Sequence, residues 1–547
     1  MLPRTYSKRL GEKYRAYFSN PILEDSTSSP TTLQIIRDWC LSCRANHETC
    51  NRFVQQDGWC PTRLIDIGNH NEEEWQLYIP PKSGCTRPVY ITLSYRWGSD
   101  DAFKLTEEKL RSGFHGRIED LAQTFKDAVM VARLLSVRYL WVDRLCIVQD
   151  SRLDWETESV EMRRVYANSF CNIAASASTS PKGGLFRSRN PENIQPGWVI
   201  KESEKSEENR YHVVDMDYLN RQVYAGPLHR RGWVFQERML APRTIHFAED
   251  QVVWECFEEL KCEQFPKRIP MIFPIKSDFD ILASAPGIST VEKTLHESNI
   301  ARLWDSLLRR YTHCSFTRES DRLVAFSGIA HLFQETTGDE YVAGLWRSCL
   351  VESLAWRTES PAMRPSDSYC APSWSWASIS GPVTMLACDG SQAHATISDV
   401  QVQSSGPKSM GLVSSGEIKL DGCLIQSVCV PIGRTVRYIV ELGPRRVESI
   451  MTFDAVEVGS REKRFVVCLP LRTAVSSDNL YTRVPGPVST TQFLVLEAVC
   501  SVSHVYRRVG YVDFWLEDWL EDSGITINSD GKAVYSEDGS SSEITLV

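Results

Sequence analysis

The central part of the sequence predicts an α/β fold in which helices flank a parallel β-sheet. Short apolar runs typical of buried strands alternate there with longer segments whose apolar residues recur at helical spacing. Such an alternation is the pattern of a parallel sheet with crossover helices. The predicted elements, in chain order, are strand 89–95, helix 119–136, strand 138–143, strand 145–149, helix 154–169 and strand 169–176.

Each element is identified by its local pattern. The first strand, VYITLSY, is short and strongly apolar, as a strand buried on both faces is. In the first helix, residues such as Leu121, Phe125 and Ala128 share one face. Asp154 is a good N-cap for the second helix. The pattern therefore places two crossover helices between neighbouring strands of one sheet.

The length of the chain, 547 residues, predicts two or three domains, because it exceeds what one hydrophobic core usually holds. We expect a helical and irregular region at 1–88 and the α/β domain at 89–256. A mainly helical region should follow at 257–382. Residues 383–547 alternate β-rich runs with Gly, Ser and Pro and predict a mainly β region, whose Ser-, Gly- and acid-rich end we expect to be disordered.

Composition and charge exclude several classes of function. The net charge of -9 and pI of about 5.8 leave no basic face, so we expect no nucleic-acid partner. No apolar run is long enough to span a membrane. The odd number of cysteines, 17, favours reduced thiols and a cytoplasmic location. No phosphate-binding P-loop spacing occurs, and no cofactor is indicated.

Candidate ligand-binding residues follow two predicted strands. Ligands of open parallel sheets bind outside the carboxyl ends of the strands. Asp143 ends the strand at 138–143, where its carboxylate either caps the next turn or contacts a ligand. The end of the first strand supplies candidates that either pack and cap the turn or touch a ligand: Ser94, Tyr95, Arg96 and Trp97.

Glu158 is the candidate catalytic residue. At about 100° per residue its side chain falls on the same helical stripe as Trp155 and Met162. A carboxylate on an apolar face is costly unless it is paired or used. Either Glu158 forms a buried salt bridge with Arg96, Arg144 or Arg231, or it lines a pocket with a perturbed pKa.

Two further groups have both a structural and a functional interpretation. The Arg-rich block 227–243 predicts an ion-pair network that docks one element on another, or else Arg231 and Gln236 reach a phosphate or ribose. Cys43, His47 and Cys50 share a helical face, as zinc ligands would, with Cys40 or Cys60 as a fourth ligand. Because Ile36 and Trp39 lie on that face too, an apolar stripe explains the same spacing.

Three blocks of the chain resemble the heterokaryon-incompatibility (HET) domain proteins of filamentous fungi. The resemblance rests on a strand ending in L-S-Y-x-W-G, on a D-W-x-x-E-x-x-x-M-x-x-x-Y pattern and on R-G-W-x-x-Q-E-R-x-L-x-x-R. The matching segments are YITLSYRWG (90–98), YLWVDRLCIVQD (139–150) with the residues up to Tyr166, and PLHRRGWVFQERMLAPR (227–243). Flanking segments such as APSWSWAS (371–378) also resemble parts of these proteins.

The resemblance implies fungal allorecognition, a form of innate immunity that ends in programmed cell death. It also implies distant similarity to TIR domains, and hence a TIR-like or flavodoxin-like core. Some TIR domains cleave NAD at the nicotinamide–ribose bond with a glutamate. By this resemblance NAD would be a substrate of this protein, and Glu158 would be the catalytic glutamate. The resemblance further implies a protein partner and homo-oligomerisation. A non-enzymatic interaction module that recruits the death machinery is the alternative.

Overall fold

The computed structural model divides into two compact units, Met1–Ala283 and Ser284–Val547, each described by itself. The residues that the structure describes are 22–52, 59–81, 87–98, 103–195, 197–201, 209–213, 217, 219–269, 275–283, 290–358, 362–365, 369–385, 392–404, 410–432, 437–442, 447–455, 463–476, 488–499, 504–515, 525–527, 533–535 and 542–547.

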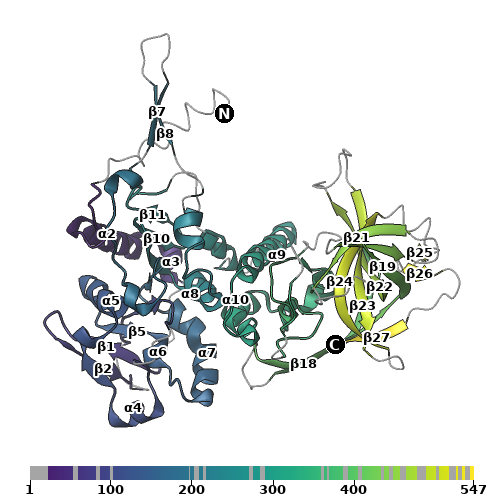
Figure 1. Ribbon diagram of the computed structural model, residues 1–547, viewed down its shortest axis with the longest axis horizontal. Helices are drawn as coiled ribbons and strands as arrows, with labels where there is room; N and C mark the ends of the chain where they lie inside the picture. The colour runs from purple at the N-terminus through teal and green to yellow at the C-terminus, as the bar shows by residue number, and fades with distance from the viewer. Residues whose placement is uncertain are drawn as a thin grey trace. The chain divides into compact units, whose positions relative to one another are not determined.

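The first unit is built on a nine-stranded sheet (Figure 1). The strand order across it is β11-β10-β9-β6-β3-β5-β1-β2-β4. In chain order the strands are β1 (Leu64–Asp66), β2 (Glu74–Tyr78), β3 (Tyr90–Ser94), β4 (His115–Arg117), β5 (Tyr139–Trp141), β6 (Asn172–Ala174), β9 (Arg243–Phe247), β10 (Val252–Cys256) and β11 (Leu260–Cys262).

The four central strands, β9-β6-β3-β5, pair in parallel, as the sequence predicts. The outer strands pair antiparallel on both sides, so the whole sheet is mixed and not purely parallel. The reason is the length of the connections. Short links such as those from β9 to β10 and from β1 to β2 can join only antiparallel neighbours, whereas parallel neighbours need a long crossover.

Two segments differ from their predicted structure. No strand forms over the predicted range 145–149: its first two residues belong to a short helix, α6 (Asp143–Cys146), and the rest is irregular. Its apolar residues are buried all the same, and periodicity alone cannot separate a short buried helix from a strand. The region before residue 89, expected to be helical and irregular, contributes β1 and β2 to the sheet in addition to its helices α2 (Pro30–Asn46) and α3 (Glu48–Arg52).

The crossover helices define the edge of the sheet where a ligand would bind. Helix α5 (Gln123–Leu134) connects β3 to β5, and α7 (Arg152–Ala167) connects β5 to β6. Because β5 and β6 lie on opposite sides of β3, the chain changes direction at the carboxyl end of β3. Such a switch point is where open α/β sheets place their ligands.

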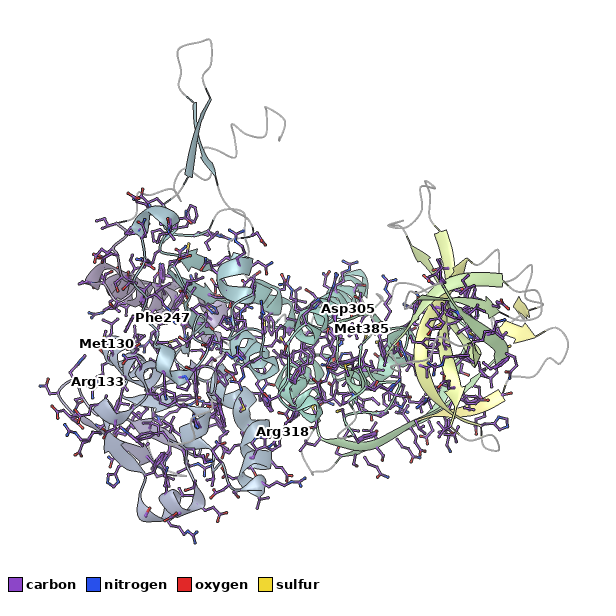
Figure 2. The ribbon with its side chains drawn as sticks, in the orientation of Figure 1. Met130, Arg133, Phe247, Asp305, Arg318 and Met385 are labelled. Atoms are coloured by element: carbon purple, nitrogen blue, oxygen red, sulfur yellow. The ribbon has the colours of Figure 1, made fainter. Side chains whose placement is uncertain are left out.

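Helix α5 shows how the layers are held together. Its inner residues, among them Ala128 and Ala132, are fully buried, whereas Met130 faces outward (Figure 2). Arg133 lies near its end and donates hydrogen bonds of 2.6 Å to the carbonyl oxygens of Ile67 and Glu72. These bonds tie α5 to the β1–β2 hairpin.

The second unit combines helices with a ten-stranded sheet. Its main helices are α9 (Thr290–Thr312), α10 (Ser327–Thr337) and α11 (Leu350–Ser353). Strand β23 pairs with both β22 and β24, so six strands form a closed circuit, β22-β19-β20-β21-β24-β23. The strands are β16 (Gln392–Ala393), β17 (Thr396–Ser404), β18 (Val413–Gly422), β19 (Ile425–Pro431), β20 (Arg437–Leu442), β21 (Val447–Phe453), β22 (Arg464–Ser476), β23 (Val488–Ala498), β24 (Val505–Trp515) and β27 (Ser542–Leu546).

The expected disorder of the C-terminal end is wrong for β27. This strand lies between β18 and β24, antiparallel to the first and parallel to the second. Ile544 and Leu546 are buried, so two apolar residues in a polar tail suffice to complete the sheet. Parts of the remaining tail, such as 536–541, lie outside the described residues. Among the helices that are described, none is long and apolar enough to cross a membrane.

Candidate functional site at the carboxyl end of β3

The carboxyl ends of β3 and β5 bring together residues that the sequence places in separate motifs. Ser94 is the last residue of β3, and Tyr95, Arg96 and Trp97 follow it directly. Asp143 begins α6, two residues after β5 ends. Parallel pairing of the two strands aligns these ends at one edge of the sheet.

The solvent-accessible part of the site is a rim around Asp143. The Trp97 indole Nε1 donates to the Asp143 carboxylate over 2.7 Å, and the indole itself is 38% exposed. The Arg144 guanidinium lies 5.5 Å from the centre of the Trp97 ring. Arg231 Nη1 donates to the carbonyl oxygen of Tyr95 over 2.8 Å. Arg96, Asp143 and Arg231 are each partly exposed, so a solute can reach the rim.

Beneath the rim, a buried chain of hydrogen bonds ends at Glu237. Thr92 donates to the Asn172 side-chain oxygen, and the Asn172 side-chain nitrogen donates to Ser94 Oγ, each over 3.0 Å. Ser94 Oγ in turn donates to Glu237 over 2.5 Å. Glu237 lies on α8 (Gly232–Leu240), the helix that precedes β9. The chain of donors leaves Glu237 as its final acceptor.

Burial perturbs the acids of the site. It raises the pKa of the Glu237 carboxyl to about 7, against the opposing effect of the hydrogen bond from Ser94. Burial also raises the pKa of Asp143, although the nearby Arg231 guanidinium favours its charged form. The pKa of the Tyr95 hydroxyl is raised by burial and then by the charge of Asp143. Perturbed acids at the mouth of a sheet are typical of functional sites.

Replacing Glu237 with glutamine is expected to change how stability depends on pH. With a pKa raised from 4.5 to about 7, the folded chain keeps a proton that the unfolded chain releases. The stability that this proton supplies is complete below pH 4.5 and is lost as the pH rises through about 7. Relative to wild type, the variant should therefore gain up to about 3 kcal/mol between about pH 4 and pH 8.

Denaturant titration of both proteins across this pH range measures the difference in the free energy of unfolding. Glu249→Gln is the control, because it makes the same chemical change at an exposed carboxylate. A difference for Glu237→Gln that does not change with pH would contradict the raised pKa.

The predicted catalytic residue, Glu158, lies on the buried face of α7 and is 3% exposed. Its carboxylate accepts from Thr62 Oγ1 over 2.6 Å and from Arg63 Nη2 over 3.2 Å. Arg63 also holds Asp154, which accepts the Val148 backbone N–H and is not the N-cap. Burial raises the pKa of Glu158, and the bond from Thr62 opposes this.

The partner of Glu158 is thus Arg63, in the segment before β1, and not one of the three arginines expected from the sequence. Arg231 lies at the rim instead, and Arg144 lies against Trp97. Gln236 is buried on α8 beside Glu237. The hydrogen bonds that the described residues form with Glu158 connect it to Thr62 and Arg63.

The Arg-rich block does contain the predicted ion-pair network. Arg238 donates two hydrogen bonds, of 2.7 and 2.6 Å, to the buried carboxylate of Glu255 on β10. This pair docks α8 on the sheet. Glu237, the neighbouring residue, was assigned by the sequence to the same network. The available signal is a carboxylate in a helix that is otherwise apolar apart from Gln236 and Arg238, GWVFQERML.

The cysteine and histidine side chains that the sequence offers as zinc ligands also lie together in the structure. Cys43, His47 and Cys50 gather at the end of α2 and in α3, and Cys256 of β10 joins them. The fourth member is therefore neither Cys40 nor Cys60.

The fold and the site define the class of this protein: an α/β domain with polar and acidic residues at the switch point of a mixed sheet. The family model described as heterokaryon incompatibility protein (HET) matches residues 90–237. That match begins at β3 and ends at Glu237, so it contains the residues at the end of β3, Asp143 and the buried acceptor Glu237. Residues 90–237 are therefore the segment of this chain that matches a HET domain. No curated protein and no solved structure matches it.

Proposed function

We propose that this protein is a heterokaryon-incompatibility factor whose HET domain cleaves NAD at the nicotinamide–ribose bond and thereby triggers cell death. The observation that carries the proposal is the partly exposed residue Asp143 beside an exposed indole and two arginines. The description of the matching family supports the role in incompatibility. NAD cleavage rests on the predicted similarity to TIR domains together with this chemistry.

The reaction asks little of an acid catalyst. The bond between ribose C1′ and the nicotinamide nitrogen breaks, and its electron pair stays on the ring, which leaves neutral. Water then forms a bond to C1′ and releases a proton, so the products are ADP-ribose, nicotinamide and H⁺. The transition state resembles an oxocarbenium ion, as in glycoside hydrolysis, and a carboxylate nearby stabilises its positive charge.

The rim supplies groups suited to each part of NAD. The Asp143 carboxylate would hold the ribose hydroxyls and face the developing charge at C1′. The exposed face of Trp97 would stack on a base. Arg96 and Arg231 would neutralise the pyrophosphate. Tyr95 and Ser94 would then support this arrangement from the buried side.

Two further carboxylates are candidates for a direct part in the reaction. Glu158 is the residue proposed from the sequence, and its carboxylate accepts hydrogen bonds from Thr62 and Arg63. Glu237 is hydrogen-bonded to Ser94 at the end of β3, and the charges of Asp143 and Arg231 both act on it. We therefore favour Glu237 as the group that takes up the proton from water.

The test is the NAD content of host cells that express the full chain or its variants. Asp143→Asn and Glu237→Gln should slow NAD loss by about 100-fold or more, because each removes a charge or a proton acceptor from the reaction. Glu158→Gln tests the sequence-based assignment in the same assay. The control is Glu156→Gln, a carboxylate on the same helix that pairs with the exposed Arg152.

The outcomes separate the two kinds of function. Loss of NAD cleavage and of toxicity in the Asp143 variant, with both activities retained in the control, supports the enzyme. Toxicity without NAD loss would overturn the enzymatic proposal and favour an interaction module that recruits the death machinery. Activation by a protein partner or by homo-oligomerisation is part of the proposal, since TIR-like sites are often completed between protomers.

A further inference from the structure

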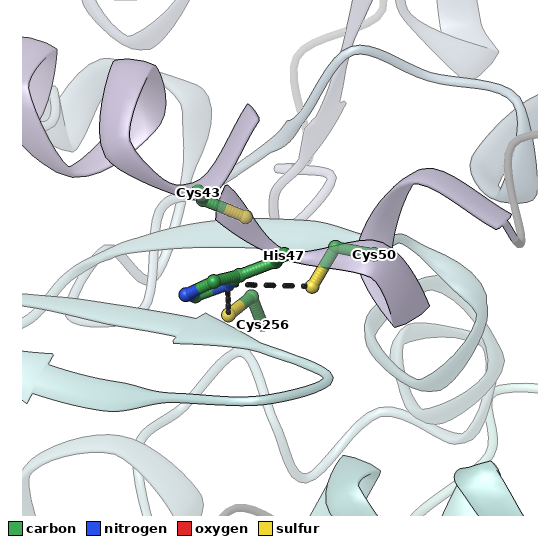
Figure 3. A group of neighbouring side chains, drawn as sticks. All are labelled: Cys43, His47, Cys50 and Cys256. Carbon is green, nitrogen blue, oxygen red and sulfur yellow. Dashed lines mark hydrogen bonds between the residues drawn. The ribbon is translucent and has the colours of Figure 1, made fainter. Parts of the chain in front are cut away.

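We propose that Cys43, His47, Cys50 and Cys256 bind one structural zinc ion that fastens the N-terminal helices to the sheet. The four side chains each offer one ligand atom, and these atoms all lie within 4.8 Å of one another. Figure 3 shows them converging from the end of α2, from α3 and from β10. All four residues are buried.

The spacing of the ligand atoms fits a tetrahedral site. The His47 Nδ1 atom lies 3.4 Å from Cys256 Sγ and 3.8 Å from Cys50 Sγ. For zinc bonds of about 2.3 Å to sulfur and about 2.05 Å to nitrogen, the N–S edge of a tetrahedron is about 3.6 Å. The two observed separations bracket this value. Three sulfurs and one imidazole form a ligand set that selects zinc over magnesium or calcium.

The groups around the cluster are arranged as outer partners of a metal site are. The other ring nitrogen of His47, Nε2, lies 3.3 Å from the Glu259 carboxylate, which would accept its proton and leave Nδ1 free to bind metal. Arg243 Nε and the Glu259 backbone N–H each donate to a cluster sulfur over 3.2 Å. N–H donors directed at ligand sulfurs are typical of the outer partners of metal sites.

A core of buried thiols does not explain the cluster equally well. Cys40 on α2 and Cys262 on β11 are also buried cysteines, but neither is a member of the cluster. The cluster differs by holding an imidazole edge-on to two sulfurs. A buried imidazole needs polar partners for both nitrogens, and the acceptor Nδ1 here faces thiol sulfurs, whose S–H groups are weak donors. A metal ion at the centre satisfies all four ligands at once.

The site would join segments that are more than 200 residues apart in the chain. Cys43, His47 and Cys50 lie before the matched HET segment, and Cys256 follows it on β10. Since the four protein ligands are buried and fill a tetrahedral shell, no position remains for a substrate. The zinc would therefore act in folding, and its loss should loosen α2 and α3 from β10.

The experiment measures the zinc content of the purified full chain by inductively coupled plasma mass spectrometry. The wild type should hold about one zinc per chain, and Cys43→Ala and Cys256→Ala should lower this at least about fivefold. Cys40→Ala is the matched control, because Cys40 is buried on the same helix one turn from Cys43. Its zinc content should equal that of the wild type.

Cobalt provides a second readout if the cysteine variants fail to fold. Wild-type chain stripped of metal with a chelator under reducing conditions and reloaded with Co²⁺ should show the intense visible absorption of tetrahedral cobalt thiolate. Folded wild type that holds no zinc and gives no such spectrum would overturn the proposal. So would a disulfide between Cys256 and a neighbouring cysteine, or equal zinc in all variants. None of these readouts depends on NAD cleavage.

Discussion

Replacing Arg508 with alanine is expected to destabilise the second unit by about 3–5 kcal/mol, because it leaves the buried Asp454 carboxylate without its counter-charge. Arg508 lies in β24 and is fully buried. Its guanidinium donates to Asp454 over 2.8 and 3.1 Å and to the carbonyl oxygens of Leu354 and Trp356, each over 2.5 Å. It also lies 3.3 Å from the centre of the Trp356 ring.

Hydrogen exchange of the full chain measures the local free energy of opening in β24. Arg507→Ala is the control, because the neighbouring arginine is 44% exposed in its side chain and pairs with Glu497 at the surface. That change should cost about 1 kcal/mol or less. Similar protection of β24 in both variants would show that burial of the Arg508 pair does not determine stability there.

Replacing Glu255 with glutamine is expected to cost the first unit about 3–5 kcal/mol, since two buried cations lose one counter-charge. Glu255 is fully buried and accepts from Arg238 and, over 3.2 Å, from His246. Lys276 Nζ lies 4.0 Å away. The glutamine has the same shape, so the loss reports charge and not packing.

This change should also reach the candidate site, because Arg238 docks α8, the helix that carries Glu237. Denaturant unfolding of the full chain gives the free energy, and hydrogen exchange of α8 shows whether that helix loosens first. Glu249→Gln, which removes a surface partner of Arg187, should have an effect below about 1 kcal/mol. An equally small effect of Glu255→Gln would mean that the buried cations find other partners.

The sequence predicted the centre of the first unit well. VYITLSY forms β3, the helix expected over 119–136 is α5, and the helix expected over 154–169 is α7. These elements have strong local patterns, because a strand buried on both faces is apolar throughout and a helix on a sheet has one apolar face. The edge was missed because β1 and β2 are short, and because their pairing with β5 and β4 joins segments far apart in the chain.

The candidate site shows the same limit. Sequence spacing correctly placed Ser94, Tyr95 and Asp143 at the ends of neighbouring strands, since parallel strands align their carboxyl ends. It also placed Glu158 on the buried face of its helix. It did not identify Arg63 as the partner of Glu158, because ion pairs between segments 95 residues apart leave no periodic signal.

The sequence by itself determined the α/β core, the HET resemblance and the residue types gathered at the end of β3, because hydrophobic periodicity and motif order are local properties of the chain. Only the tertiary structure decided which carboxylate joins that edge and which cysteine completes the cluster of Cys43, His47 and Cys50. Glu237 and Cys256 reach these places through the docking of α8 and the pairing of β10. Both depend on contacts between distant segments, and such contacts are settled by packing and charge pairing in the folded chain.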